Sequence, residues 1–317
     1  MNYKHIPVML NEALNYLDPQ PGQYFIDCTL GGAGYTVAIA ERIGPKGKII
    51  AIDLDKMAIE NAKFQISNFK FQNIILANEN FKNTTKITKK YFHKKKVDGI
   101  VFDLGLSSAQ LADRSRGFSF QLDTPLNMSF GCQMSDFGCR TTEDIVNNWK
   151  QEKLEKIIRE YGEERFAKRI ARKIVECREL KSIKTTGRLV EIINQAVPDF
   201  YKRKKINCAT KTFQALRIAS NNELENLKKT LPQAVDLLAQ GGKIVVVSYH
   251  SLEDRIAKNF FRQESRGCLC PPGYPVCQCE HKQQLKILTR GIVAAGKEEA
   301  AKNPRSRSAK LRAAEKI

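Results

Sequence analysis

The sequence predicts an α/β fold, in which a mainly parallel sheet has helices on both faces and a helical insertion interrupts the chain. Strand and helix signals alternate through the first hundred residues and resume after residue 211. Residues 108–211 between them hold no convincing strand. Regular alternation of this kind is typical of a parallel sheet. We therefore expect residues 1–107 to form the first part of the α/β domain. We expect residues 108–211 to form an inserted helical domain, a candidate for recognition of a binding partner, and residues 212–317 to form the second part with a basic C-terminal tail.

The first half of the chain carries four expected strands, each a short apolar run next to turn residues. They lie in residues 22–30, 47–55, 73–81 and 95–108. Helices are expected at 34–44, where Gly44-Pro45 ends the pattern, and at 56–66. In the fourth strand, Ile100, Val101 and Phe102 precede Asp103.

The insertion begins with a loop, residues 112–131, and continues as helices. The clearest helix covers 162–180, where Phe166, Ile170 and Ile174 recur every four residues. Its other faces carry Arg165, Lys168, Arg169, Arg172 and Lys173. Beyond the insertion we expect a helix at 222–242 that contains Pro232, a strand at 243–251 and a helix at 253–262.

The charge balance indicates a polyanionic partner. The chain has 53 Lys and Arg against 34 Asp and Glu, a net charge of +19. Such an excess attracts nucleic acid first and an anionic membrane surface second; the alternative is a basic protein with no such partner.

No apolar run is long enough to span a membrane, the start does not resemble a signal peptide, and no membrane partner is expected. Nine cysteines in such a chain are expected to be reduced thiols in the cytoplasm. The sequence leaves open a monomer or a homodimer.

The stretch DCTLGGAGYT, residues 27–36, predicts a ligand loop, because ligands of open parallel sheets bind at the carboxyl ends of the strands. It matches the dinucleotide pattern only loosely, and no P-loop motif is present. Asp27 and Asp103 at strand ends would repel a pyrophosphate. They suit a cofactor with a cationic amino group and a sulfonium, and S-adenosylmethionine has both.

Two further strand-end residues fit this cofactor. Asp53, about twenty residues after the glycines, is well placed to accept hydrogen bonds from ribose hydroxyls. Phe81, after the third strand, could lie against the adenine. The alternative is a tight turn common to the fold, with solvated acids.

Several blocks of sequence together resemble one family. They are HIPVML (5–10), AIDLD (51–55), DGIVFDLGLSSAQL (98–111), RGFSF (116–120), YGEERFAKRIARKIV (161–175), TFQALRI (212–218), SYHSLEDRI (248–256) and NPRSRSAKLR (303–312). In order and over nearly the whole chain, they are similar to the bacterial small-subunit ribosomal RNA cytosine-N4 methyltransferases, the RsmH/MraW family. The resemblance implies a class I, Rossmann-like methyltransferase that uses S-adenosylmethionine. Its implied target is a cytidine in the decoding region of 16S rRNA, within the small ribosomal subunit.

The resemblance also implies the cofactor contacts. They fall on Ala33, Gly34, Tyr35, Asp53, Phe81, Asp103 and Gln110. The chain departs from the family at four positions. Ala33 and Tyr35 stand where Gly and His are usual, Asn127 where Asp is common, and Tyr249 where Phe is usual. Backbone contacts survive at Ala33 if its φ is negative, whereas any role of the family's imidazole is lost at Tyr35.

Methylation of an exocyclic amine needs an acceptor for the amine hydrogens, because the nitrogen lone pair is delocalised into the ring. The candidate is Asp103, or a backbone carbonyl in the 104–108 turn; alternatively Asp103 only binds cofactor. Methylation at C5 is disfavoured, since it needs a cysteine nucleophile and no cysteine lies between Cys28 and Cys132. His250, at the end of a late strand, either hydrogen-bonds substrate or braces its turn.

The target base must leave its stack to reach the methyl group. Phe118 and Phe120 could stack on it, or they pack in a core. Phosphate contacts are expected from the basic helix at 163–173, unless it is simply a solvated face, and from the tail. The basic residues of the tail are Arg305, Arg307, Lys310 and Arg312.

The expected activity needs no metal. Four late cysteines are nevertheless close in sequence, at Cys268, Cys270, Cys277 and Cys279, with His281 beside them. They could bind a structural Zn²⁺, although the C-x-C spacing is not the usual C-x2-C.

Three functions therefore compete. The first is an rRNA N4-cytidine methyltransferase. The second is a methyltransferase acting on DNA or protein. The third is a basic RNA-binding assembly factor whose cofactor pocket is vestigial, which Asp53, Asp103 and Gln110 argue against.

Overall fold

The computed structural model describes residues 7–69, 72–93, 96–107, 110–111, 113–121, 123–131, 140–203, 205–271 and 276–317. The chain divides into two compact units. The sheet unit comprises Met1–Leu106 and Leu224–Ile317, and the helical unit comprises Ser107–Glu223. The second boundary was expected at 211/212 and falls instead at 223/224, because the helix α11 (Thr210–Asn221) packs against helices of the insertion. Within the described residues, no helix is long and apolar enough to cross a membrane.

The sheet unit contains one seven-stranded sheet in the order β3-β2-β1-β4-β5-β7-β6. The five strands from β1 to β5 run parallel, and β7 and β6 add an antiparallel pair at one edge, which confirms a mainly parallel sheet. The strands are β1 (Tyr24–Asp27), β2 (Lys48–Asp53), β3 (Ile74–Asn78), β4 (Val97–Leu104), β5 (Leu238–Ser248), β6 (Leu285–Ile287) and β7 (Lys310–Lys316). The strand order reverses between β1 and β4, where open α/β sheets bind ligands.

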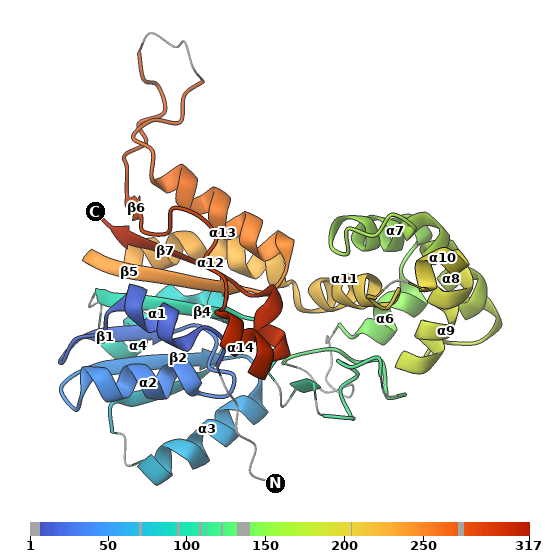
Figure 1. The fold of residues 1–317 in the computed structure, drawn as a ribbon, viewed down its shortest axis with the longest axis horizontal. Helices are drawn as coiled ribbons and strands as arrows, with labels where there is room; N and C mark the ends of the chain where they lie inside the picture. The colour runs from blue at the N-terminus through green and yellow to red at the C-terminus, as the bar shows by residue number, and fades with distance from the viewer. Residues whose placement is uncertain are drawn as a thin grey trace. The chain divides into compact units, whose positions relative to one another are not determined.

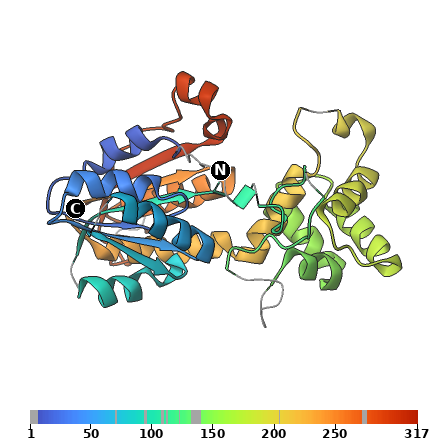
Figure 2. The same ribbon diagram turned by 90° about the horizontal axis from the view of Figure 1, so that it is seen from below.

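Helices cover both faces of this sheet, as Figures 1 and 2 show. On one face α1 (Leu10–Leu17) and α2 (Gly34–Ile43) pack on inward residues such as Phe25 and Ile49. On the other, α4 (Thr84–Phe92), α12 (Glu223–Leu237) and α13 (Ser251–Glu264) pack on Ile26 and Ile50. Successive residues of β1 and β2 thus serve opposite cores, and this is why both strands are continuous apolar runs. The helix α3 (Lys56–Phe69) follows β2, and a 3-10 turn, η1 (Phe81–Asn83), follows β3.

The C-terminal segment is more regular than a basic, turn-rich tail. After α14 (Lys297–Lys302) and the 3-10 turn η2 (Pro304–Ser308), β7 enters the sheet between β5 and β6. Leu311 and Ala313 are buried on one side of it. Arg312 Nε donates to Asp254 Oδ1 of α13 at 2.6 Å, and Lys310 Nζ lies 3.6 Å from Asp254 Oδ2. Lys310 and Arg312 of the expected basic tail therefore belong to a strand of the sheet, and both pair with the Asp254 carboxylate. Their contact with phosphates stays a prediction.

The helical unit is built from six labelled helices within its described part. They are α6 (Thr142–Asn148), α7 (Gln151–Glu160), α8 (Ala167–Leu180), α9 (Thr186–Ala196), α10 (Asp199–Lys202) and α11. The expected helix at 162–180 corresponds to α8, which buries Ile170 and Ile174. The opening loop is tied to this core, since Pro125 pairs with Thr185 in an isolated β-bridge.

Candidate cofactor site at the carboxyl edge of the sheet

The glycine loop is held in shape by Asp27, the last residue of β1. Asp27 Oδ1 accepts the Thr29 N–H at 3.0 Å, and Oδ2 accepts the Thr36 hydroxyl at 2.6 Å. The carboxyl group is fully buried, and burial raises its pKa. Both oxygens of Asp27 therefore accept hydrogen bonds from the loop, one near each end of it. The strand-end pattern predicts a cationic ligand for Asp27 but does not reveal Thr29 and Thr36 as its partners.

The three loop residues expected to contact cofactor have distinct local roles. Ala33 precedes α2 in the left-handed conformation, with φ 62° and ψ 9°. The condition of a negative φ at this position is therefore not met. At Gly34, an added Cβ would lie 2.7 Å from Pro7 Cγ, so the chain before α1 crosses directly over the start of α2.

Tyr35 points away from solvent. Its hydroxyl donates to the Val8 carbonyl and its ring is buried with the α1–α2 core. The side chain that replaces the family's histidine thus anchors the chain before α1, and only the Tyr35 backbone is left for a ligand.

Asp53 ends β2 and closes the loop from the other side. Its Oδ2 accepts the Gly31 N–H at 2.9 Å, and its Oδ1 accepts the Asp55 N–H at 2.8 Å. Burial raises the pKa of Asp53 to about 6, and the charges of Asp55 and Asp27 act in the same direction. Each oxygen retains a second lone pair that can accept a hydroxyl hydrogen.

Phe81 follows β3 as the first residue of η1. Its ring is half-buried and packs edge-to-face on Phe102 of β4, with 6.1 Å between ring centres. Phe81 therefore lies at the same end of the sheet as the acids, with part of its surface exposed.

Asp103 lies near the carboxyl end of β4, next to the strand that carries Asp27. Its backbone N–H donates to Thr29 Oγ1 at 2.6 Å, and its Oδ1 accepts the Tyr249 hydroxyl at 2.7 Å. Burial raises the pKa of Asp103 to about 7; the Tyr249 hydrogen bond opposes this shift, and the charges of Asp27 and Glu253 add to it. The hydroxyl that distinguishes Tyr249 from the family's usual Phe thus holds the candidate acceptor in place.

Three carboxyl groups consequently meet at the ends of three adjacent strands, β2, β1 and β4. Among the described residues, the charges that shift the pKa of Asp53 and Asp103 are all acidic. Carboxylates brought together without a cation favour a positively charged ligand and disfavour a phosphate. The site therefore fits a cationic cofactor with hydroxyl groups.

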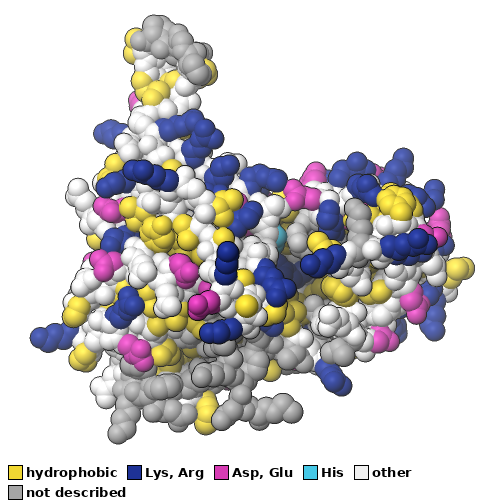
Figure 3. All heavy atoms as spheres, in the orientation of Figure 1, with side chains coloured by type: hydrophobic (Ala, Val, Ile, Leu, Met, Phe, Trp, Pro, Cys, Tyr) yellow, Lys and Arg dark blue, Asp and Glu magenta, His cyan; other side chains and the backbone are white. Residues whose placement is uncertain are grey.

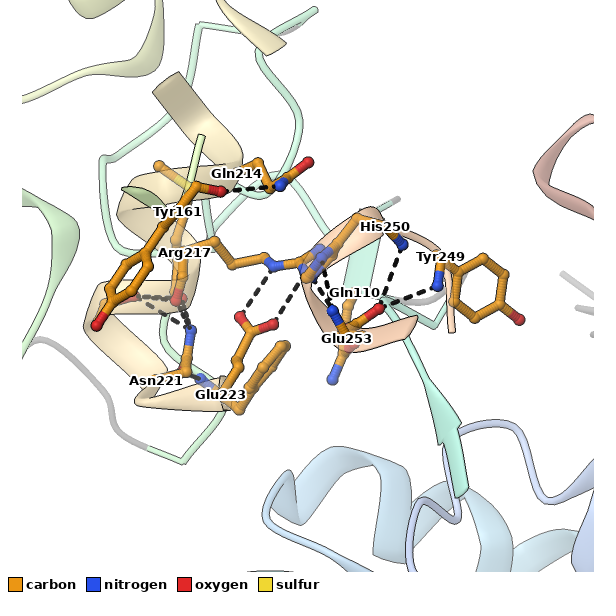
Figure 4. Close-up of polar contacts among 12 residues, drawn as sticks. Gln110, Tyr161, Gln214, Arg217, Asn221, Glu223, Tyr249, His250 and Glu253 are labelled. Carbon is orange, nitrogen blue, oxygen red and sulfur yellow. Dashed lines mark hydrogen bonds and ion pairs between the residues drawn. The ribbon is translucent and has the colours of Figure 1, made fainter. Parts of the chain in front are cut away.

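His250 begins α13 as its N-cap. Its Nδ1 accepts the Glu253 N–H at 3.4 Å, while Glu253 Oε2 accepts the N–H groups of Tyr249 at 3.0 Å and of His250 at 3.3 Å (Figure 4). These reciprocal bonds form a capping box. The observed contacts match the interpretation that His250 braces the turn. Histidine followed three residues later by glutamate resembles a capping signal, and this pattern could have predicted the role of Glu253.

Gln110 belongs to the helical unit. Its Oε1 accepts the Ser107 N–H at 2.9 Å, and its own N–H donates to Ser107 Oγ at 3.1 Å. The same unit contains a two-point ion pair in which Arg217 Nε and Nη2 each lie 2.9 Å from a Glu223 oxygen (Figure 4). Contact between Gln110 and cofactor stays a prediction.

The aromatic residues of the opening loop pack within the helical unit. Phe118 is buried and stacks on Phe130, with 5.3 Å between ring centres, and Phe120 meets Phe213 edge-to-face at 5.3 Å. The structure thus favours the packing alternative for Phe118. Asn127 is also buried, and its Oδ1 accepts the Ser129 N–H at 3.2 Å.

Comparison with known proteins gives the same family over the full chain. A family model described as the MraW methylase family matches residues 2–317. Proteins named ribosomal RNA small subunit methyltransferase H are similar, one from Finegoldia magna at 44% identity and one from Heliobacterium modesticaldum at 42%, each covering 100% of both chains. The protein of that name from Halothermothrix orenii is 46% identical and covers 99% of each chain. The order of the strands, the acids at their ends and these matches agree, and the chain belongs to the MraW methylase family.

Proposed function

We propose that this protein transfers a methyl group from S-adenosylmethionine to N4 of a cytidine in the decoding region of 16S rRNA. The proposal rests on the family and on the names of the relatives, which specify small-subunit ribosomal RNA. The structural observation that carries it is Asp103, a half-buried carboxyl group held by Tyr249 at the carboxyl edge of the sheet.

Different residues of the chain would contact different parts of this cofactor. The Ala33–Tyr35 backbone and Gln110 would contact it, Asp53 would accept its ribose hydroxyls, Phe81 would pack on its adenine, and Asp103 would lie near its positive charge. S-adenosylmethionine supplies an electrophilic methyl group when bound.

Asp103 is proposed to act on the cytosine amine. Accepting a hydrogen bond from that amine lets the nitrogen lone pair leave conjugation with the ring and turn toward the methyl carbon. The cofactor, held by the residues named above, would supply the methyl group, and its carbon–sulfur bond would be exchanged for the new bond from nitrogen to carbon. The surplus proton passes from the amine to the Asp103 carboxylate and then to water. A pKa near 7 suits a group that must take up and release a proton.

The helical unit and the net charge support an RNA substrate. The chain carries a charge of +19, and Figure 3 shows Lys and Arg side chains spread over the visible face. We assign Ser107–Glu223 the role of substrate recognition. Since ribosomal subunits are assembled in the cytoplasm, the proposal places the protein there.

The test supplies purified protein and cofactor with two substrates from cells that lack this protein, naked 16S rRNA and the small ribosomal subunit. Mass spectrometry of the nucleosides is expected to show N4-methylcytidine, and calorimetry is expected to show cofactor binding. Formation of 5-methylcytidine would refute the choice of atom. Cofactor binding without methylation of either RNA would favour another substrate, and absence of cofactor binding would favour the assembly factor.

Asp103→Asn tests the acceptor separately. We expect turnover to fall by about 10²–10⁴ with cofactor affinity largely kept, because asparagine cannot take up the proton. Asp98→Asn is the matched control, since Asp98 lies on the same strand and accepts the Tyr24 N–H at 2.8 Å, near the opposite end of β4. Near-normal turnover in Asp103→Asn would show that Asp103 is not the acceptor. Loss of cofactor affinity alone would restrict it to cofactor binding.

A further inference from the structure

The described part of the segment between α13 and β6, residues 265–271 and 276–284, lacks the packing that holds the rest of the sheet unit together. It projects from the sheet unit beyond α13 (Figure 1). Among its described residues, 265–271 and 276–284, none is buried. Its larger apolar side chains face solvent, with Leu269 37% and Val276 70% exposed. Burial of apolar surface therefore does not explain the conformation of this segment.

Four cysteine thiols converge within this segment. The Sγ atoms of Cys268, Cys270, Cys277 and Cys279 all lie within 4.8 Å of one another. Cys268 Sγ is 3.4 Å from Cys277 Sγ and 3.7 Å from Cys279 Sγ, and the last two sulfurs are 3.6 Å apart. Four soft ligands thus converge on one point, in a segment whose described residues include no buried side chain.

Backbone amides also point at these sulfurs. The Leu269 N–H donates to Cys279 Sγ at 3.2 Å, the Cys270 N–H to Cys268 Sγ at 3.4 Å, and the Gln278 N–H to Cys270 Sγ at 3.3 Å. Hydrogen bonds to sulfur stabilise a thiolate, which is the form that binds metal.

The distances between sulfurs distinguish a metal site from disulfides. A disulfide needs about 2.05 Å between its sulfurs. A tetrahedral zinc site with bonds of about 2.3 Å places its sulfurs about 3.8 Å apart. The observed separations of 3.4–3.7 Å are close to the second value and far from the first.

We propose that Cys268, Cys270, Cys277 and Cys279 form a structural zinc site that fixes the segment between α13 and β6. Four thiolates fill the coordination sphere of Zn²⁺ and leave no position for a substrate, so the site contributes to folding and not to methyl transfer. The free energy of zinc binding would stabilise the folded conformation of this segment in place of a hydrophobic core, as it does in small zinc domains. One C-x-C pair, Cys268 and Cys270, comes from the first part of the segment, and the other, Cys277 and Cys279, comes from the second part.

The first measurement is the metal content of the full chain, purified under reducing conditions from cells grown with added zinc, without a metal-affinity resin. We expect about one zinc per chain. Cys270→Ser and Cys279→Ser are expected to fall below about 0.1 zinc per chain, since three thiolates bind more weakly than four. Gln278→Ser is the matched control. It changes an exposed side chain between two ligands, keeps the backbone N–H, and is expected to retain the metal.

The second measurement keeps the test decisive if a serine variant folds poorly. The zinc of the unmodified chain is exchanged for Co²⁺, and four thiolates around cobalt give intense sulfur-to-metal charge-transfer absorption with tetrahedral d–d bands. Zinc below about 0.1 per chain without these bands would overturn the proposal. So would mass-spectrometric detection of disulfides among the four cysteines in the freshly purified, unreduced chain. Removal of zinc by a chelator is expected to raise proteolytic cleavage within 265–284 while the rest of the chain stays resistant.

Discussion

Ala33 shows how one residue can carry a conformation that it does not favour. With φ at 62° it occupies the left-handed region, and its side chain is buried against Leu30 and Ile59. The left-handed conformation costs an alanine about 1–2 kcal/mol, whereas glycine adopts it freely. The loop keeps its shape here because Asp27, Asp53 and Gly31 hold it by hydrogen bonds on both sides.

Ala33→Gly is therefore expected to raise the free energy of unfolding by up to about 1 kcal/mol. Relief of about 1–2 kcal/mol of strain exceeds the extra entropy of glycine in the unfolded chain, about 0.5–1 kcal/mol, and loss of the buried Ala33 methyl group offsets part of the difference. Urea unfolding at fixed cofactor concentration measures the difference. Ala38→Gly is the control, because Ala38 lies inside α2, where glycine costs about 1 kcal/mol. Equal destabilisation by both variants would contradict the strain at Ala33.

Tyr249 sets the ionisation of Asp103. Its hydroxyl donates to Asp103 Oδ1 and lowers the pKa of that carboxyl group, which burial has raised to about 7. In Tyr249→Phe the hydrogen bond is lost, so the pKa of Asp103 moves higher. If the ionised carboxylate accepts the amine proton, activity is lost as pH falls through this pKa. The acid limb of kcat/KM against pH is then expected near 7 in the unmodified chain and at higher pH in the variant.

Tyr16→Phe on α1 supplies the control for this measurement, since its ring lies on a helix that does not carry the site. It is expected to leave the acid limb unchanged. A Tyr249→Phe variant that folds normally and keeps the limb at its original pH would separate Tyr249 from the ionisation of Asp103.

At the scale of elements, α13 depends on its N-cap, the residue that precedes the helix. His250 accepts the Glu253 N–H, and Glu253 returns hydrogen bonds to the backbone of Tyr249 and His250. Loss of a cap costs about 0.5–2 kcal/mol. His250→Ala is thus expected to lower the free energy of unfolding by about 1 kcal/mol. His250→Asn, which offers a capping oxygen in place of the imidazole Nδ1, is expected to restore most of this loss.

The two variants also distinguish capping from catalysis. If His250 only caps α13, His250→Asn keeps near-normal kcat at a temperature where both variants are folded. A kcat that falls equally in both variants, with His250→Asn as stable as the unmodified chain, would instead assign a substrate contact to the imidazole. Thermal unfolding and steady-state kinetics on the same samples supply both readings.

The elements that sequence reasoning predicted well are those with strong local patterns. The strands β1 to β4 are apolar on both faces and are followed by polar residues, so their carboxyl ends are visible in the sequence. By contrast, β7 alternates Lys310, Arg312 and Glu315 with Leu311, Ala313 and Ala314, and its charges resemble a solvated tail. Only its partner Asp254, far away in the sequence, explains why those charges can lie over the sheet.

For the site, the position of the acids could be predicted but their partners could not. The strand-end rule places Asp27, Asp53 and Asp103 at one edge before any coordinates are known. That Asp27 binds its own loop and that Tyr249 holds Asp103 depends on side-chain directions set by tertiary packing. The same holds for Ala33, since sequence alone does not fix the sign of φ at one residue.

At the scale of the whole molecule, the positive charge is divided between paired and unpaired groups. On α8, Arg172 and Lys173 pair with Glu176. Just before this helix, Arg165 lies over the rings of Phe166, Phe200 and Tyr201. Lys168 and Arg169 are exposed on α8; Arg169 also lies over the Phe166 ring, at 5.9 Å, and no ion pair is found for either residue among those described. Charges without an acidic partner are the ones most available to phosphates.

Lys168→Gln together with Arg169→Gln is accordingly expected to weaken binding of 16S rRNA and to flatten its dependence on salt. Each lost phosphate contact removes about 0.7–0.9 from the slope of log affinity against log salt concentration, because fewer counterions are released on binding. Lys56→Gln together with Lys228→Gln changes the net charge equally, but these lysines pair with Glu60 and Glu225 on helices of the sheet unit. That control is expected to keep nearly the original slope. Equal flattening by both pairs would mean that affinity follows net charge alone, and an unchanged slope in the α8 variant would remove this helix from the RNA-binding surface.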